Sequence, residues 1–291
     1  SLKDSSVVTT GNNSAGTAVS ARAMMKVENS TVSTTGDSSP AIMIADGGGI
    51  LIADGGSFTT SGAMSQGIYS KGDVTVTNAS VNALNAKAAV LKGNNTITLS
   101  GTILEGKETA DTIPYNIVLF SDEKDIGTMG TQHFDVRGGS LISHKGGMFY
   151  VTATHGKISL NGTAITMDDP AANLITVAGN DGANGWGTPG RNGGHVELVA
   201  DNRILTGNIS VDSISNINMT LKNNSTFNGI ISIVPNAEGG EKYKTNADVF
   251  IAAGSTWNLT GNSTLTSLYN LGTINYNGYT ITLADGTVMK E

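Results

Sequence analysis

The residues of this chain that could do chemistry are few and scattered. Adjacent acidic side chains occur at Asp168-Asp169 and at Asp122-Glu123. Glycoside hydrolysis needs two carboxyl groups that flank one bond at a separation of about 5–10 Å, so Asp168 and Asp169 are the candidates for a catalytic pair. Pro170 follows them directly, and proline beside aspartate is typical of a solvated turn. We therefore favour the turn and assign no catalytic residue.

Metal and nucleophile sites have little support in the sequence. The four histidines are His133, His144, His155 and His195. Their spacings are not those of zinc ligands on one element, although His133 and His155 lie about one repeat apart, which allows a stacked surface pair. Cysteine, a G-x-S-x-G nucleophile motif and a phosphate-binding P-loop are all absent from the sequence. We therefore predict no metal site and no cofactor.

A glycine-rich segment, residues 179–194 (GNDGANGWGTPGRNGG), is the best candidate for binding. Within it Trp186 offers a flat aromatic face, while Asp181 and Arg191 offer polar partners. This combination suits a sugar ring. The alternative, which we favour, is that Trp186 folds back and covers apolar side chains on the flank of the scaffold.

The elements that must position these residues are short, repeated strands. Residues 55–102 hold two copies of one unit, in which Phe58 and Val81 lie 23 residues apart, as do Val76 and Leu99. Each copy has three runs of alternating apolar and Ser/Thr residues separated by glycine. A repeat of this length and pattern is typical of one coil of a solenoid.

The same unit recurs along the whole chain. An apolar anchor opens each coil, and seven of the ten intervals fall between 22 and 26 residues. The anchors are Val7, Val32, Phe58, Val81, Ile103, Leu141, Ala164, Ile204, Phe227, Trp257 and Tyr279. The residues expected inside the middle strands are Val19, Ile42, Ile68, Val90, Val118, Phe149 and Ile175. Closing strands carry apolar pairs at i and i+2, such as Ile50/Ile52, which share one face.

These patterns predict an all-β fold, a right-handed, single-stranded parallel β-helix of about eleven coils with three short strands per coil. Neighbouring coils shield the apolar side chains that one coil cannot bury alone. We expect a single domain over residues 1–291. The long intervals predict loop excursions near 105–132, 179–194 and 235–247, where binding residues often lie.

Composition narrows the functional classes. The chain has 38 glycines, 14% charged residues and a net charge of −7, which disfavours nucleic-acid binding because phosphate neutralisation needs clustered Lys and Arg. No apolar run is long enough for a membrane-spanning helix. No signal peptide opens the sequence, so we expect either a processed chain or one that is not secreted.

One stretch resembles a known family. Residues 254–265 read GSTWNLTGNSTL, and Leu268, Leu271 and Ile274 follow. This run is similar to the last coils of pertactin-like autotransporter passengers, while the other coils are similar to pectin-lyase-like β-helices in composition alone. The resemblance implies a bacterial surface or secreted rod, associated with the outer membrane, and a translocator barrel further along the chain. From the residues alone we expect Trp257 in the core.

We therefore expect a non-catalytic, adhesin-like protein at the bacterial cell surface or outside the cell. Its flank of Ser, Thr and Asn suits contact with glycans, with a host or neighbouring-cell surface, or with another copy of the chain. We expect no nucleic-acid partner and no membrane insertion by these residues. The alternatives are a polysaccharide lyase or glycoside hydrolase on the same scaffold, and a purely structural stalk.

Overall fold

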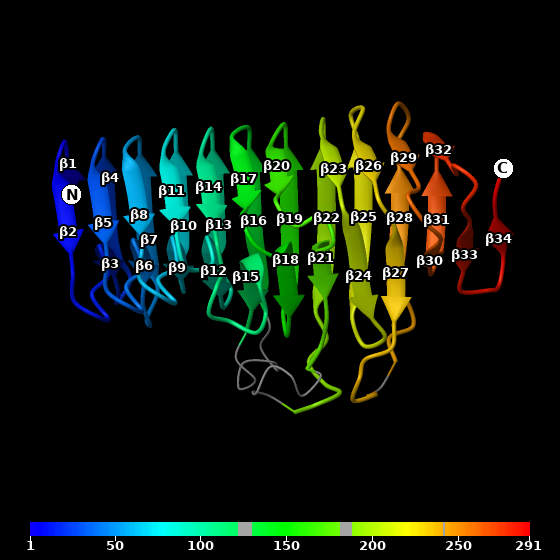
Figure 1. Ribbon diagram of the computed structural model, residues 1–291, viewed down its shortest axis with the longest axis horizontal. Helices are drawn as coiled ribbons and strands as arrows, with labels where there is room; N and C mark the ends of the chain where they lie inside the picture. Colours follow the sequence, from blue (N-terminus) through cyan, green and yellow to red (C-terminus); the bar gives the residue numbers. More distant parts are fainter. Residues whose placement is uncertain (122–129, 181–187, 241) are drawn as a thin grey trace.

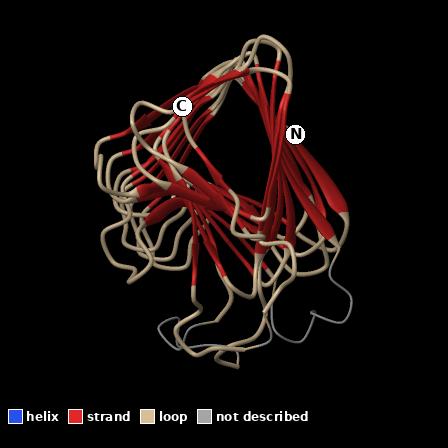
Figure 2. Ribbon diagram, turned by 90° about the vertical axis from the view of Figure 1, so that its right-hand side faces the viewer, coloured by secondary structure: helices blue, strands red, loops and turns tan. Residues whose placement is uncertain are grey.

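The structure is a computed structural model that describes residues 1–121, 130–180, 188–240 and 242–291. The chain forms a rod in which successive coils lie side by side from the N-terminus to the C-terminus (Figure 1). Seen end-on, three walls of strands surround the interior (Figure 2). The described residues contain no helix, and their long sheets are parallel. The predicted parallel β-helix is confirmed.

Sheet A extends from β1 to β31 and contains eleven strands, as many as the predicted coils. Its strands are β1 (Leu2–Lys3), β4 (Ala23–Glu28), β7 (Gly49–Asp54), β10 (Asp73–Thr77), β13 (Thr96–Ser100), β16 (Thr131–Arg137), β19 (His155–Asn161), β22 (His195–Asp201), β25 (Asn216–Lys222), β28 (Ala247–Ile251) and β31 (Ser267–Asn270). Alternate residues of these strands point inward, because successive side chains leave a strand on opposite faces.

Sheet B forms the second wall and divides into two parts. Its seven-stranded part consists of β2 (Ser6–Thr9), β5 (Thr31–Thr34), β8 (Ser57–Thr60), β11 (Ser80–Ala83), β14 (Ile103–Gly106), β17 (Ser140–Ser143) and β20 (Ala164–Met167). Its four-stranded part consists of β23 (Ile204–Thr206), β26 (Thr226–Asn228), β29 (Thr256–Asn258) and β32 (Thr273–Asn275).

Sheet C forms the third wall. Its nine-stranded part consists of β3 (Thr17–Val19), β6 (Ile42–Ile44), β9 (Ile68–Ser70), β12 (Ala89–Lys92), β15 (Tyr115–Phe120), β18 (Gly147–Thr152), β21 (Asn173–Val177), β24 (Asn208–Asp212) and β27 (Ile231–Val234). The last coils add β30 (Ser263–Leu265), β33 (Ile281–Leu283) and β34 (Val288–Met289). Strand β34 turns back and pairs antiparallel with β33.

The core is a set of apolar columns that run along the rod. In sheet B, Phe58 lies opposite Val81, which lies opposite Leu104. All three are fully buried, whereas Ile103 is 45% exposed. The prediction that Ile103 belongs to this interior row is therefore wrong. Ile103 and Leu104 are adjacent apolar residues whose side chains lie on opposite faces of the strand. Assigning the inward position to Ile103 instead of Leu104 therefore places the wrong side chain in the core.

The same one-residue error affects other predicted interior positions. Ala164 and Ile204 point outward while Ile165 and Leu205 point inward. Leu51 and Ala53, rather than Ile50 and Ile52, fill the interior of β7.

Of the two aromatic anchors nearest the C-terminus, Trp257 lies in the interior and Tyr279 does not. Tyr279 is exposed, and Ile274 takes the place opposite Trp257. Trp257 is fully buried, and its indole N–H donates a 3.0 Å hydrogen bond to the Gly229 carbonyl oxygen. Its predicted place in the core is confirmed.

Turns between the strands bring backbones very close together. A Cβ atom placed on Gly62 would lie 2.0 Å from the carbonyl oxygen of Gly36 in the preceding coil, so glycine is required by the approach of the two backbones. Asparagine occupies some of these turns, and Asn13 and Asn223 have φ values of 56° and 53°. This is the left-handed conformation that asparagine tolerates.

An asparagine ladder lies on the four-stranded part of sheet B. The Asn258 side-chain amide donates to Oδ1 of Asn228 at 2.7 Å, and Asn275 donates to Oδ1 of Asn258 at 2.6 Å. The three residues lie opposite one another on β26, β29 and β32. Each side chain supplies both a donor and an acceptor, so identical residues in register satisfy one another.

We expect Leu104→Ala to lower the free energy of unfolding by about 2–5 kcal/mol, because it leaves a cavity in a fully packed column. Ile103→Ala is the matched control and should cost less than about 1 kcal/mol, since its side chain is largely solvated. Urea unfolding followed by circular dichroism measures both. Equal losses would contradict the assigned register.

Candidate functional site

The predicted Trp186 site cannot be placed as a unit. Trp186 and Asp181 lie outside the described residues, so their assignment stays a prediction. Arg191 is exposed and lies beside an open hollow of about 610 Å³ that Asn192 and Glu238 also line. The backbone carbonyl of Arg191 accepts a 2.8 Å hydrogen bond from the N–H of Asn180. The described residues thus show Arg191 at the surface without a ligand-binding arrangement around its guanidinium.

The acidic pair Asp168-Asp169 divides between two structural roles. Asp168 Oδ2 lies 2.9 Å from Nδ1 of His144, whose Nε2 lies 3.4 Å from Oε2 of Glu105. Asp169 Oδ1 accepts a hydrogen bond from the backbone N–H of Ala171 and thereby closes the turn. Hydrogen bonding to Asp168, aided by Glu105, raises the pKa of His144 although partial burial opposes the rise. Glu105, His144 and Asp168 therefore form a surface charge chain across three coils.

A stacked histidine pair exists, but it is not His133 with His155, the pair that the spacing allows. The register places Thr131 opposite His155, and His133 opposite Lys157. His155 instead stacks on His195, with ring centroids 4.6 Å apart and an interplanar angle of 28°. The repeat interval of 22–26 residues does not indicate this pair, because the connection between β19 and β22 is longer than one regular coil.

The surroundings of His195 make a small polar hollow of about 120 Å³ on sheet A. Nδ1 of His195 lies 2.9 Å from Oδ1 of Asn216, and the Tyr243 ring centroid lies 4.9 Å from that of His195. Burial lowers the pKa of His195, and the neighbouring His155 adds to the effect while Asn216 opposes it. No group of three or more His, Asp or Glu side chains is arranged to hold a metal ion within the described residues.

The most distinctive surface lies on the outside of sheet C. There Tyr69, Val90, Val118 and Tyr150 face one another on the successive strands β9, β12, β15 and β18. These four side chains form an apolar cluster separate from the core. The prediction that Val90 and Val118 point inward is therefore wrong, because Ala89, Leu91, Ile117 and Leu119 fill the interior instead.

A groove of about 220 Å³ opens over this cluster, and we call it the sheet C groove. It is lined by Gln66, Tyr69, Lys87, Val90, Asp111, Ile113, Val118, Phe120, Tyr150 and Thr152. A second hollow of about 390 Å³ shares Gln66 and Tyr69 with it and extends past Met43. The two hollows together follow the long axis of the rod over strands β6 to β18.

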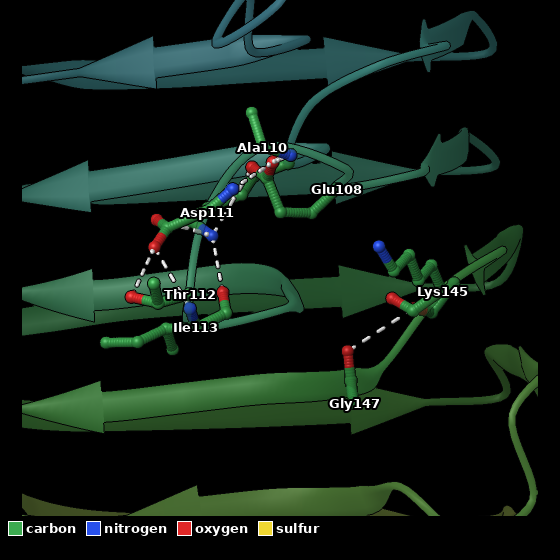
Figure 3. Close-up of polar contacts among 9 residues, drawn as sticks. Glu108, Ala110, Asp111, Thr112, Ile113, Lys145 and Gly147 are labelled. Atoms are coloured by element: carbon green, nitrogen blue, oxygen red, sulfur yellow. Dashed lines mark hydrogen bonds and ion pairs between the residues drawn. The ribbon is translucent and has the colours of Figure 1, made fainter. Parts of the chain in front are cut away.

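The rim of the groove contains an ionic cluster in which Lys87 and Glu108 are buried and Asp111 is exposed. Nζ of Lys87 lies 3.0 Å from Oδ2 of Asp111 and 3.4 Å from Oε2 of Glu108, and it donates to the Ile113 carbonyl at 2.7 Å. Oε1 of Glu108 accepts hydrogen bonds from the backbone N–H groups of Ala110 and Asp111 (Figure 3). These bonds fold residues 107–114 back over the outside of sheet C, where Ile113 packs on the apolar cluster.

Asp111 is an anion in this cluster. Burial raises the pKa of its carboxyl group, but the Ile113 N–H and the Lys87 ammonium more than offset this, so the pKa lies below its ordinary value. At the other side of the groove, the buried Oγ1 of Thr152 has no hydrogen-bond partner among the described residues. A buried hydroxyl without a partner costs free energy.

The sequence does contain a signal for this groove. Ala89-Val90-Leu91 and Ile117-Val118-Leu119-Phe120 are continuous apolar runs rather than alternating ones. A strand with such a run is apolar on both faces. This signal indicates an outward apolar surface at β12 and β15.

Comparisons with known proteins do not assign a family. No protein-family model, no curated protein and no solved structure gives a significant match to this chain. None of the described residues belongs to a helix long and apolar enough to cross a membrane.

The His144 chain predicts a pH-dependent contribution to stability. The pKa of His144 is higher in the folded protein than in the unfolded one, so its charged contacts contribute their full stability below the unfolded pKa of about 6.5. This stability is lost as the pH rises through the folded pKa. The imidazole is 40% exposed, so we expect His144→Ala to cost about 0.2–1 kcal/mol at acidic pH. The cost should shrink at alkaline pH.

Urea unfolding at several pH values measures this dependence. His133→Ala is the matched control, because His133 forms no ion pair among the described residues. A cost for His144→Ala that grows with rising pH would contradict the assigned charge chain.

Proposed function

We propose that this chain is a non-catalytic, adhesin-like β-helix protein that binds a linear glycan in the sheet C groove. The observation that carries the proposal is an aromatic and apolar groove on the outside of a solenoid whose core is already complete without it. An outward apolar cluster of this kind is not needed to bury the coils, and a groove with apolar walls is the usual form of a ligand site.

The groove offers the two kinds of contact that a sugar ring needs. Tyr69 and Phe120 are half-buried rings that can lie against the apolar face of a pyranose. Gln66 and Asp111 lie along the same groove and supply polar atoms for hydroxyl groups. Pockets with apolar walls and a few polar groups are typical of ligand sites.

The direction of the groove favours an extended ligand. Strand β9 pairs with β12, β12 with β15 and β15 with β18, so the lining side chains advance by about one strand spacing of 4.8 Å per coil. This advance is close to the length of one sugar unit in a linear chain. A glycan lying parallel to the rod axis would place successive rings over successive coils.

We further propose a bacterial cell-surface or secreted location, associated with the outer membrane. The support is the similarity of residues 254–265 to the last coils of pertactin-like passengers. A rod with a continuous core and a polar flank suits contact with a host or neighbouring-cell surface. Self-association through the flank is the other contact that the rod allows, and it is an alternative outcome of the binding test.

The alternative function is polysaccharide cleavage on the same scaffold. The carboxylates at the groove oppose it, because Glu108 and Asp111 both lie against Lys87. Asp168 is likewise held by His144. Release of oligosaccharides from a panel of acidic polysaccharides would overturn the non-catalytic proposal. Loss of that release in the double variant Asp168→Ala with Asp169→Ala would then place catalysis at this pair.

We expect Tyr69→Ala and Phe120→Ala each to weaken glycan binding about tenfold, equivalent to about 1.4 kcal/mol. Tyr269→Ala is the matched control, because Tyr269 is an aromatic side chain on sheet A that is 63% exposed. A glycan array identifies a linear oligosaccharide, and calorimetry with that oligosaccharide measures affinity. Absence of binding on the array, or an equal loss with Tyr269→Ala, would contradict the proposed site.

A further inference from the structure

Lys87 occupies an unusual position for a lysine. Its side chain is 8% exposed, and the neighbouring Glu108 side chain is 2% exposed. Lysine and glutamate are rarely buried to this extent unless they are paired. Two carboxylates rather than one face the single ammonium group, at 3.0 Å for Asp111 and 3.4 Å for Glu108. The arrangement therefore holds one amine against two carboxyl groups.

We propose that Lys87 and Asp111 join through an intramolecular amide bond, with Glu108 acting as the proton relay. The bond would link the connection between β11 and β12 to residues 107–114, which connect β14 to β15 one coil further along. The inference rests on the geometry of this cluster and is independent of glycan binding.

The reaction balances without any external reagent. The starting groups are the Lys87 ammonium and the Asp111 carboxylate. A proton leaves Nζ, the freed amine attacks Cγ of Asp111, and a carbon–oxygen bond of the carboxyl group breaks. The products are one amide and one water molecule. No electron is gained or lost, so the step needs no oxidant or cofactor.

Glu108 is placed to carry the proton. Its Oε1 is fixed by the N–H groups of Ala110 at 2.8 Å and Asp111 at 3.0 Å, which leaves Oε2 facing Nζ. Oε2 can accept the proton from Nζ and return it to the leaving oxygen of Asp111. A carboxyl group within reach of the reacting amine is the requirement for such general acid–base catalysis.

The contact between Lys87 and Asp111 favours condensation over hydrolysis. Groups held in contact react with effective molarities of about 10⁵–10⁸ M, which offsets the unfavourable equilibrium of amide formation in water. Lys87 is 8% exposed in this pair, and the amide removes its charge from a site that holds it away from solvent.

The test is the mass of the intact, full-length chain measured under denaturing conditions. We expect the wild-type protein to be lighter than its sequence by one water molecule. Digestion should yield one branched peptide that joins the segment around Lys87 to the segment around Asp111. A wild-type mass equal to the sequence mass, after folding and prolonged incubation, would overturn the proposal.

Substitutions of Lys87, Asp111 and Glu108 test the amine, the carboxyl group and the proton relay separately. Lys87→Arg keeps the ionic contacts but should retain its full sequence mass, because a guanidinium does not form this amide. Asp111→Asn should lose one ammonia instead of one water, and Glu108→Gln should retain its full mass. Circular dichroism confirms that each variant is folded. A bond that still forms in Glu108→Gln would overturn the relay role of Glu108.

Discussion

The structure depends on the mutual shielding of neighbouring coils. Val74 of β10 lies between Leu51 of β7 and Ile97 of β13, and each of these side chains is covered by the coils on either side. Full burial of such a side chain contributes about 1.5–3 kcal/mol, yet one coil cannot obtain it alone. The backbone has the same dependence, because each parallel strand donates and accepts its hydrogen bonds across the coil boundary. Stability is therefore a property of the stack.

This constraint leaves the outer faces free to vary. The inward residues must be apolar and of matched size, whereas outward residues need only be compatible with strands. On sheet A the outward rows include ionic and stacked pairs, such as Lys157 with Glu197 and Phe250 with Tyr269. On sheet C the outward row of Tyr69, Val90, Val118 and Tyr150 forms a groove. The scaffold fixes the spacing of these side chains and leaves their chemistry open.

The sequence predicts the architecture well because repetition amplifies a weak signal. One alternating run is ambiguous, but eleven related runs at similar intervals specify a solenoid and its approximate coil number. The face assigned to a given residue is less certain. Ile103-Leu104 offers two adjacent apolar side chains, and the pairing of Leu104 with Val81 and Leu141 decides between them. Register is a property of the neighbouring coils and is not readable from one coil.

The sites are harder to predict than the fold, for a related reason. His155 and His195 meet because β19 pairs with β22, and the length of the intervening connection hides that pairing. The Lys87 cluster joins residues of two different coils through a connection that leaves the repeat altogether. Contacts between coils depend on which residues share a register, and excursions from the repeat remove the spacing that would reveal it.

The groove and the core are separable parts of the molecule. Interior columns pass beneath β12 and β15 through Leu91 and Leu119 without using the outward residues. Residues 107–114 are held instead by Lys87, Glu108 and the backbone N–H groups around them. Changes in this ionic cluster should therefore alter the shape of the groove before they alter the stacking of coils. A surface that varies independently of its scaffold is suited to recognition, because its ligand can change while the rod stays intact.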